Sequence, residues 1–308
     1  MSKLPNFLVA GSPKCGSTSL FYYLNEHPEI FMAPQKEIHY FSSEILNTLD
    51  QGPKDKRVNA FHINNYRSYL NQFKKAKPSQ VIGEVSPSYI NYPETTIPKI
   101  KKHLGNPKII VLIRDPVKRA YSNYFHLVRE DREKLSFYEA LKQEETRMKK
   151  KYSDFWYYRF NSLYYNKIKK FDDAFDEILI LTTESLKENT EITMKLIYNF
   201  LEVNENFRTQ NIQREYNSGG VYKSNLVTNF FFRQSRLRSF IKKMIPITAE
   251  MKQMKQKILK YFKEETPEMK PEAEEFLIEY FKEDVENLKN DFDIDLTMWN
   301  KKLTDSNE

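Results

Sequence analysis

The sequence predicts an α/β fold with a doubly wound, mainly parallel five-stranded sheet flanked by helices and a helical C-terminal extension. Three observations support this. Short apolar runs alternate with helical periodicity over the first two-thirds of the chain, the order that builds parallel βαβ units. One run, KIIVLI at Lys108–Ile113, is apolar on both faces, as a buried parallel strand should be. The first apolar run leads through a glycine-containing loop into a helix, as in phosphate-binding folds.

The strands are expected in apolar runs that end at polar or turn-forming residues. These runs are Phe7–Ala10, Ile30–Met32, Gln80–Glu84, Lys108–Ile113 and Ile178–Leu181.

The helices are expected where apolar residues recur every three to four positions. The first begins near Ser17 and ends around His27, before Pro28. Another begins at Pro116, with Asp115 as its N-cap. Further helices are expected at Ile63–Phe73, Trp156–Phe175, Thr183–Leu201 and Pro271–Leu288.

The remaining segments are interpreted from their charge and composition. Asn47–Asn59 is predicted to be a loop at the rim of a substrate cleft, and Arg129–Lys151 a solvated helical face with alternating charges. Trp299 is expected to anchor the C-terminus. The basic segment Thr228–Lys243 is interpreted as a lid or packing helix, with a membrane-surface helix as the alternative.

Length and composition fit one domain over residues 1–308, with an α/β core at 1–203 and a cofactor-closing loop and helices at 204–308. The net charge of +7 comes from 49 basic and 42 acidic residues, which suits an anionic ligand and predicts no nucleic-acid partner. The single cysteine, Cys15, excludes an internal disulfide and a multi-cysteine metal site. No apolar run reaches spanning length, so we expect no signal peptide or integral membrane segment and a cytoplasmic location, with peripheral membrane contact left open.

The stretch FLVAGSPKCGSTSL, Phe7–Leu20, carries the strongest local signal for an anion site. It holds two of the chain's 7 glycines, followed by Ser17, Thr18 and Ser19 at the start of a helix. Backbone N–H groups and the helix dipole favour an anion at such a place. Gly11 and Gly16 have Walker A spacing, but Ser17 stands where the lysine of that motif belongs.

Several polar residues follow successive strands and should therefore meet at one edge of a parallel sheet, where ligands bind. Lys14 follows the first strand, Glu37 the second, Glu84 the third and Arg114 the fourth, and Ser122 lies on the helix after Arg114. Taken together, these positions predict an anion-binding site.

At this point the residues resemble a known family. PKCGSTSL at Pro13–Leu20 resembles the 5′-phosphosulfate loop of sulfotransferases, and RDPVKRAYSNY at Arg114–Tyr124 resembles their 3′-phosphate motif. Other landmarks resemble the heparan-sulfate-type and bacterial members in the same order. They are KEIHYF, GEVSPSY, Leu163-Tyr164, a late YNSGG loop and the C-terminal EYFKEDVENL and DLTMW.

The resemblance implies transfer of a sulfuryl group from 3′-phosphoadenosine 5′-phosphosulfate to an acceptor hydroxyl or amine of a carbohydrate or small molecule, without a metal. Glu37 would be the general base, with His39 beside it and Lys14 stabilising the leaving oxygen. Cofactor-binding residues implied in this way are Lys14, Cys15, Gly16, Ser17, Thr18, Ser19, Arg114, Ser122, Gly219, Gly220 and Lys223. Glu84, Ser86 and Tyr89 are expected at the acceptor. Several polysaccharide-acting members carry a lysine where this chain has Val85, so no second catalytic lysine is expected there.

Two alternatives belong to other functional classes. A P-loop kinase or NTPase would need a lysine at Ser17 and an acidic magnesium ligand after a strand, where this chain has Arg114. A non-catalytic protein that binds anions or membrane surfaces would use the basic segment Thr228–Lys243.

Overall fold

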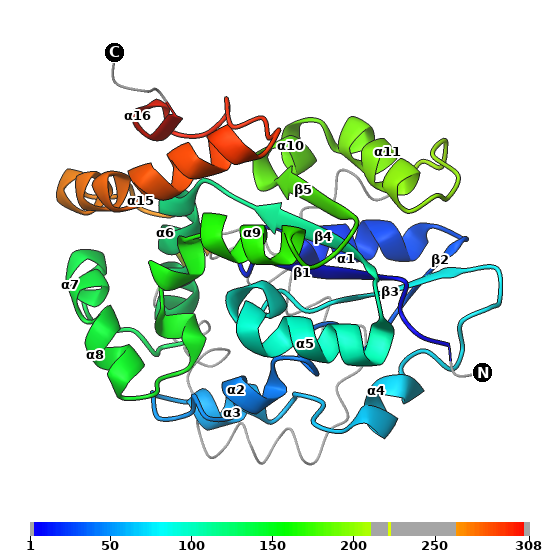
Figure 1. Ribbon diagram of the computed structural model, residues 1–308. Coiled ribbons are helices and arrows are strands. Elements are labelled where there is room, and N and C mark those ends of the chain that lie inside the picture. Colours follow the sequence, from blue (N-terminus) through cyan, green and yellow to red (C-terminus); the bar gives the residue numbers. More distant parts are fainter. Residues whose placement is uncertain (1–2, 211–220, 223–262, 305–308) are drawn as a thin grey trace.

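The computed structural model describes residues 3–210, 221–222 and 263–304. Its centre is a five-stranded, all-parallel sheet in the order β2-β3-β1-β4-β5, with helices on both faces (Figure 1). The strands are β1 (Phe7–Gly11), β2 (Ile30–Met32), β3 (Val81–Val85), β4 (Lys108–Ile113) and β5 (Ile178–Thr182). The predicted fold class is confirmed, and each strand lies within one residue of its predicted bounds.

Alternate residues of the central strands enter two separate cores, because successive side chains of a strand point to opposite faces. Phe7 and Val9 pack with one core, and Leu8 and Ala10 pack with the other. The first core includes residues of α1 (Ser17–Glu26), α10 (Thr183–Glu188) and α11 (Thr190–Phe200). The second includes residues of α5 (Pro93–Leu104), α6 (Pro116–Arg129), α9 (Tyr165–Asp172) and α15 (Pro271–Asp291).

Three short helices and a 3₁₀ turn connect the N-terminal strands. They are α2 (Ser43–Leu46), α3 (Asp55–Asn59), α4 (Tyr66–Asn71) and η1 (Tyr89–Asn91). The helix predicted at Ile63–Phe73 is therefore present but shorter, starting after Asn65, whose side chain caps it by accepting from Ser68 N at 2.8 Å.

The prediction of one helix over Trp156–Phe175 is wrong. The segment forms the 3₁₀ turns η2 (Asp154–Trp156) and η3 (Phe160–Ser162) before α9 begins. Two backbone carbonyls that would accept helical N–H groups accept from side chains instead. Tyr158 O accepts from the buried Arg119 at 3.2 Å, and Asp154 O accepts from Asn161 at 2.7 Å. Tertiary hydrogen bonds thus outweigh the helical periodicity of this stretch.

The prediction that Arg129–Lys151 is a solvated helical face is also wrong in part. The segment contains α7 (Phe137–Lys142), which starts at a Ser136–Glu139 capping box, and α8 (Glu144–Lys149). Glu133 and Arg147 are buried, and Arg147 donates to both carboxylate oxygens of Glu133 at 2.6 and 3.0 Å. Charge alternation alone did not distinguish solvated charges from buried pairs.

The C-terminal residues pack against the core. Asp284 of α15 accepts from the N–H groups of Tyr164 and Tyr165, at 2.8 and 3.1 Å, at the start of α9. Trp299 is buried and donates to Glu184 at 3.1 Å, as predicted for an anchor. The last helix is α16 (Lys301–Thr304), and β6 (Val221–Tyr222) pairs with β7 (Lys263–Glu264).

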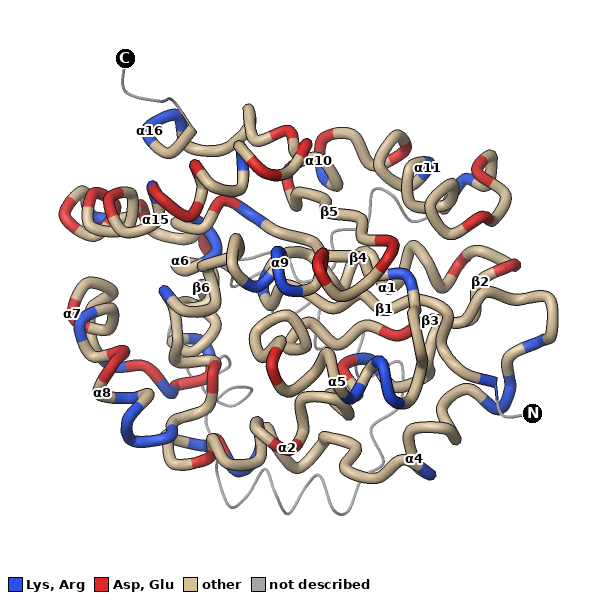
Figure 2. The backbone as a smooth tube through the Cα atoms, viewed as in Figure 1, with Lys and Arg blue, Asp and Glu red and all other residues tan. Residues whose placement is uncertain are grey.

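Charges of both signs are interspersed along helices such as α5, α8 and α15 (Figure 2). None of the helices that the structure describes is both long and apolar enough to cross a membrane. Gly219, Gly220, Lys223 and the basic segment Thr228–Lys243 lie outside the described residues.

Candidate active site

The loop between β1 and α1 has the geometry of an anion cradle. Its Gly16 is the N-cap of α1 with φ 92°, a left-handed conformation that favours glycine. The first turn of α1 has no side-chain cap and no acidic residue, so its positive end can be completed by an external anion. Ser12 Oγ, beside this turn, is buried without a hydrogen-bond partner among the described residues.

Neighbouring segments hold this loop in place. Thr183 Oγ1 donates to Cys15 O at 2.6 Å and to Ile113 O at 2.9 Å, which ties the ends of β1, β4 and β5 together. The fully buried Arg119 donates from Nε to Pro13 O at 3.2 Å. Groups outside the loop thus hold it in place, and the sequence prediction missed one of them, Arg119.

Cys15 fills space behind the cradle. Its side chain is buried, and Sγ lies 3.7 Å from Tyr164 Oη. Burial raises the pKa of the Cys15 thiol to about 11, so the thiol is protonated at neutral pH. The Cys15 side chain therefore fills space, and only its backbone belongs to the surface of the loop.

A cavity of about 1240 Å³ opens at the carboxyl ends of the strands, large enough for a nucleotide-sized ligand. The predicted residues Lys14, Gly16, Ser17, Thr18, Ser19, Glu37, Arg114 and Ser122 all line it. The structure thus brings together positions that the sequence placed after different strands.

One face of α6 lines the same cavity. After Arg114, this face carries Lys118, Ser122, His126 and Arg129, at spacings of four, four and three residues. Residues at such spacings share a helix face. The sequence prediction selected only Ser122, although the periodicity from Arg114 onward could have identified the other three.

Glu37 is held beside the end of β3 and faces the cavity. Its backbone N–H donates to Val85 O at 2.9 Å, and its carboxylate forms an ion pair with Lys36. Burial alone would raise the pKa of the Glu37 carboxyl, but the Lys36 ammonium, with smaller effects of His39 and Lys14, brings the pKa below its usual range. Glu37 is therefore a carboxylate at neutral pH, the form that a general base requires.

A smaller cavity of about 80 Å³ adjoins the large one, and the two share Lys14, Ser17, Glu37 and Phe155. His39 and His62 line the small cavity, with ring centroids 4.9 Å apart. His39 Nδ1 lies 2.6 Å from Ser88 Oγ, which fixes the ring. His62 was not predicted, since an isolated histidine in a polar stretch gives no sequence signal.

Glu84, Ser86 and Tyr89 are found in a different place from the predicted one. All three are fully buried, and neither cavity is lined by them. Glu84 accepts hydrogen bonds from Ser86 at 2.8 Å and from Tyr89 at 3.1 and 3.2 Å. Ser86 Oγ also accepts from the backbone N–H of His39 at 3.0 Å. They therefore support the cavity wall from behind, because β3 is an interior strand of the sheet.

Lys14, Glu37 and His39 share a backbone property. Their φ angles are 70°, 60° and 56°, in the left-handed region that non-glycine residues rarely adopt. Such residues cost of order 1–3 kcal/mol each and cluster at active sites. The three predicted catalytic residues thus lie where the backbone is strained.

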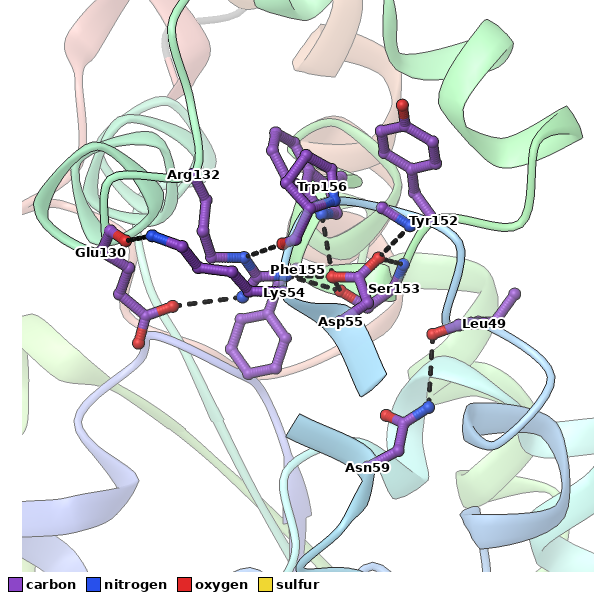
Figure 3. A network of polar contacts seen from close by, with 12 residues as sticks. Leu49, Lys54, Asp55, Asn59, Glu130, Arg132, Tyr152, Ser153, Phe155 and Trp156 are labelled. Atoms are coloured by element: carbon purple, nitrogen blue, oxygen red, sulfur yellow. Dashed lines mark hydrogen bonds and ion pairs between the residues drawn. The ribbon is translucent and has the colours of Figure 1, made fainter. Parts of the chain in front are cut away.

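A buried polar network behind the small cavity involves α3 (Figure 3). Asp55 forms an ion pair with Arg132 and accepts from Ser153 N at 2.7 Å and Trp156 Nε1 at 3.1 Å. At the end of α3, Asn59 Nδ2 donates to Leu46 O at 2.8 Å. The segment predicted as a cleft rim is therefore clamped to the chain around Ser153.

Replacing Asp55 by Ala is expected to destabilise the fold by about 3–5 kcal/mol, since it leaves the Arg132 guanidinium buried without its carboxylate. Urea unfolding measures the loss. Asp293→Ala removes an exposed carboxylate and serves as the control. Equal stability of the two variants would contradict the clamp.

The C-terminal residues close one side of the large cavity, which is lined there by Glu274 and Asn300. Asn300 Nδ2 donates to Glu274 at 3.1 Å, and its backbone N–H donates to Asp115 at 3.1 Å. Asp115 also caps α6, accepting from Lys118 N at 3.0 Å as predicted. In the part of the chain that the structure describes, no three His, Cys, Asp or Glu side chains group as a metal site would require.

Comparison with known proteins gives concordant matches. Residues 5–206 match the sequence model of the sulfotransferase family. The chain is 42% identical over 121 residues to the membrane-associated sulfotransferase kil1 of Dictyostelium discoideum, covering 39% of this chain and 22% of that protein. It is 28% identical over 167 residues to carbohydrate sulfotransferase 15 of Mus musculus, a match that covers 45% of this chain and 30% of that protein. The chain therefore matches less than a third of the length of these relatives.

Among solved structures, a sulfotransferase from Alicyclobacillus acidocaldarius superposes with a TM-score of 0.74 and 28% identity. The superposition covers 96% of this chain and 99% of that one.

Proposed function

Since this chain belongs to the sulfotransferase family, we propose that it transfers a sulfuryl group from 3′-phosphoadenosine 5′-phosphosulfate to an acceptor hydroxyl, with Glu37 as general base. The observation that carries the proposal is the junction of the two cavities. Lys14, Ser17 and Glu37 line both, so the anion cradle and the base meet at one point.

The residues present fit the donor. The uncapped N-terminus of α1, with Lys14 and the hydroxyls of Ser17, Thr18 and Ser19, suits the 5′-phosphosulfate. Arg114 and Ser122, on the same cavity wall, suit the 3′-phosphate. When bound, the donor supplies the activated sulfuryl group.

The chain's own groups act on the two reacting oxygens. Glu37 accepts the proton of the acceptor hydroxyl as that oxygen forms the new S–O bond. Lys14 stabilises the negative charge left on the bridging oxygen as the old S–O bond breaks, giving the sulfate ester and 3′-phosphoadenosine 5′-phosphate. In-line transfer of this kind depends mainly on positioning and charge stabilisation.

A carbohydrate or other small hydroxyl compound is the proposed acceptor class, in keeping with the name of the relative carbohydrate sulfotransferase 15. A cytoplasmic location stays a prediction, which cell fractionation tests. Mass spectrometry of an acceptor library incubated with the donor identifies the product.

Thermal unfolding with nucleotides tests the donor assignment. 3′-Phosphoadenosine 5′-phosphate at about 100 times its Kd should stabilise the fold by about 2.7 kcal/mol. That stabilisation raises Tm by about 5 °C or more. ATP lacks the 3′-phosphate, so its shift at equal concentration should be far smaller. Equal shifts for the two nucleotides would contradict the proposal.

Arg114→Ala should weaken binding of 3′-phosphoadenosine 5′-phosphate about 10- to 100-fold, because a hydrogen bond to a charged group contributes about 1.5–3 kcal/mol. Affinity for adenosine 5′-phosphosulfate, which lacks the 3′-phosphate, should not change. Titration calorimetry measures both. Arg67→Ala removes an exposed arginine on α4 and is the control. If the substitution weakened binding of both ligands equally, Arg114 would not be the residue that binds the 3′-phosphate.

A further inference from the structure

The small cavity meets the large one at Glu37, so an acceptor in it would lie beside a donor held in the large cavity. It shares Glu37 and Lys14 with the large cavity and extends from them toward α2 and α3. Its size and charge therefore restrict which acceptors can react.

The first restriction is size. The cavity has about 80 Å³, about half of the roughly 150 Å³ of an engineered protein cavity that holds one benzene ring. It can hold a hydroxymethyl group and one or two further atoms, but not a sugar ring. Its inner wall is apolar at Leu46, Leu49 and Val58, which suits methylene carbons.

The residues that line the small cavity are held in place by hydrogen bonds and an ion pair. Asn59 Nδ2 donates to Leu46 O. Asp55, at the start of α3, pairs with Arg132 and accepts from Ser153 N and Trp156 Nε1 (Figure 3). The volume is thus set by buried hydrogen bonds and an ion pair rather than by exposed side chains alone.

The second restriction is charge. The charged side chains among the described lining residues are Lys14, Glu37 and Asp154, a formal sum of −1. Lys14 faces the anion cradle as well, so no cation of this wall is left for an anionic acceptor. Burial lowers the pKa of His39 to about 3 and that of His62 to about 4, so both rings are neutral at neutral pH.

The neutral polar groups suit an alcohol. His39 Nδ1 contacts Ser88 Oγ and His62 Nδ1 contacts Asn47 Oδ1, which leaves the other nitrogen of each ring for a ligand hydroxyl. Resting on the proposed function, we propose that the acceptor is an uncharged compound that presents a primary hydroxyl on a narrow methylene arm. A sugar hydroxymethyl group and an unbranched alkyl alcohol share this chemistry.

Three methyl glycosides test the proposal with the donor supplied. Methyl β-glucoside carries the hydroxymethyl group, methyl β-xyloside lacks it, and methyl β-glucuronide has a carboxylate in its place. An unbranched primary alcohol and its secondary isomer form a second arm that distinguishes a sugar source from a lipid-like one. Sulfated product is measured by mass spectrometry, and acceptor binding to the protein saturated with 3′-phosphoadenosine 5′-phosphate by saturation-transfer NMR.

Glucoside or the primary alcohol should react and bind at least tenfold better than its partners. Equal use of xyloside, glucuronide or the secondary alcohol would overturn the proposal while the sulfotransferase function stands. Failure of every neutral primary alcohol, with the nucleotide still raising Tm, would also overturn it. No Tm shift with the nucleotide would instead refute the proposed function.

A substitution in the wall gives a second test. Val58→Phe fills the cavity, so it should abolish acceptor binding and transfer without changing the Tm shift caused by 3′-phosphoadenosine 5′-phosphate. Ile192→Phe, at an exposed apolar position on α11, is the matched control. Unchanged turnover by Val58→Phe would place the acceptor elsewhere.

Discussion

Glu37→Gln should lower the rate of sulfuryl transfer about 10²- to 10⁴-fold, the usual contribution of a general base. Glutamine has nearly the same shape but cannot take up the proton of the acceptor hydroxyl. The lowered pKa of Glu37 keeps the wild-type carboxylate ionised at neutral pH. The full difference in transfer rate between wild type and variant should therefore be seen at that pH. Single-turnover kinetics with saturating donor measure it without interference from product release.

The cofactor should still bind to this variant. Glu37 is not part of the α1 loop or of α6, so the Tm shift caused by 3′-phosphoadenosine 5′-phosphate should stay close to that of the wild type. Glu191→Gln removes an exposed carboxylate on α11 and controls for the change in net charge. Wild-type turnover by Glu37→Gln would exclude Glu37 as the base, whereas a lost Tm shift would indicate a binding role.

The sequence was sufficient for the sheet and for the residues that meet at its edge. Parallel strands place their carboxyl ends together, so Lys14, Glu37 and Arg114 could be brought to one site from strand order alone. Because Asp115 marks the start of α6, the sequence also indicated which side of that helix carries Ser122. These inferences depend on local chemistry and on a topology that few folds violate.

Predictions that depended on tertiary burial failed. A carboxylate that follows a strand, such as Glu84, looks like a site residue, but β3 lies between β2 and β1 and is covered on both faces. The charges of Glu133 and Arg147 pair in the interior, although they belong to an alternating run. His62 reaches the site only because α3 and its neighbours fold over the cavity. None of these outcomes is encoded in a local pattern.

Lys14→Ala should have the largest effect on kcat/KM, because the residue serves both binding and chemistry. Loss of a charge-assisted hydrogen bond weakens donor binding by about 1.5–3 kcal/mol. Loss of one preorganised charge-stabilising donor costs about 10²- to 10³-fold in kcat. Initial rates at varied donor concentration separate the two effects. Lys74→Ala, an exposed lysine, is the control, and a change in KM alone would remove Lys14 from the chemical step.

The charge of Lys14 also predicts how binding depends on pH. Burial, with repulsion from Arg129 and Arg119, lowers the pKa of the free Lys14 ammonium to about 8. A bound anion favours the charged form and raises this pKa. Below pH 8, Lys14 is already charged, so its titration should not change the affinity for 3′-phosphoadenosine 5′-phosphate. Above pH 8 the affinity should fall by up to about tenfold per pH unit, and binding should be accompanied by proton uptake.

Lys14→Arg separates this effect from other titrations, because a guanidinium stays protonated throughout the range. If it retains measurable affinity, the fall above pH 8 should disappear, and calorimetry in buffers of different ionisation enthalpy should show no proton uptake. The same slope in wild type and variant would assign the titration to another group. If binding affinity is independent of pH only in the variant, Lys14 carries the charge that the donor needs. This lysine precedes the second glycine of the loop, whereas the lysine of a Walker A motif follows it.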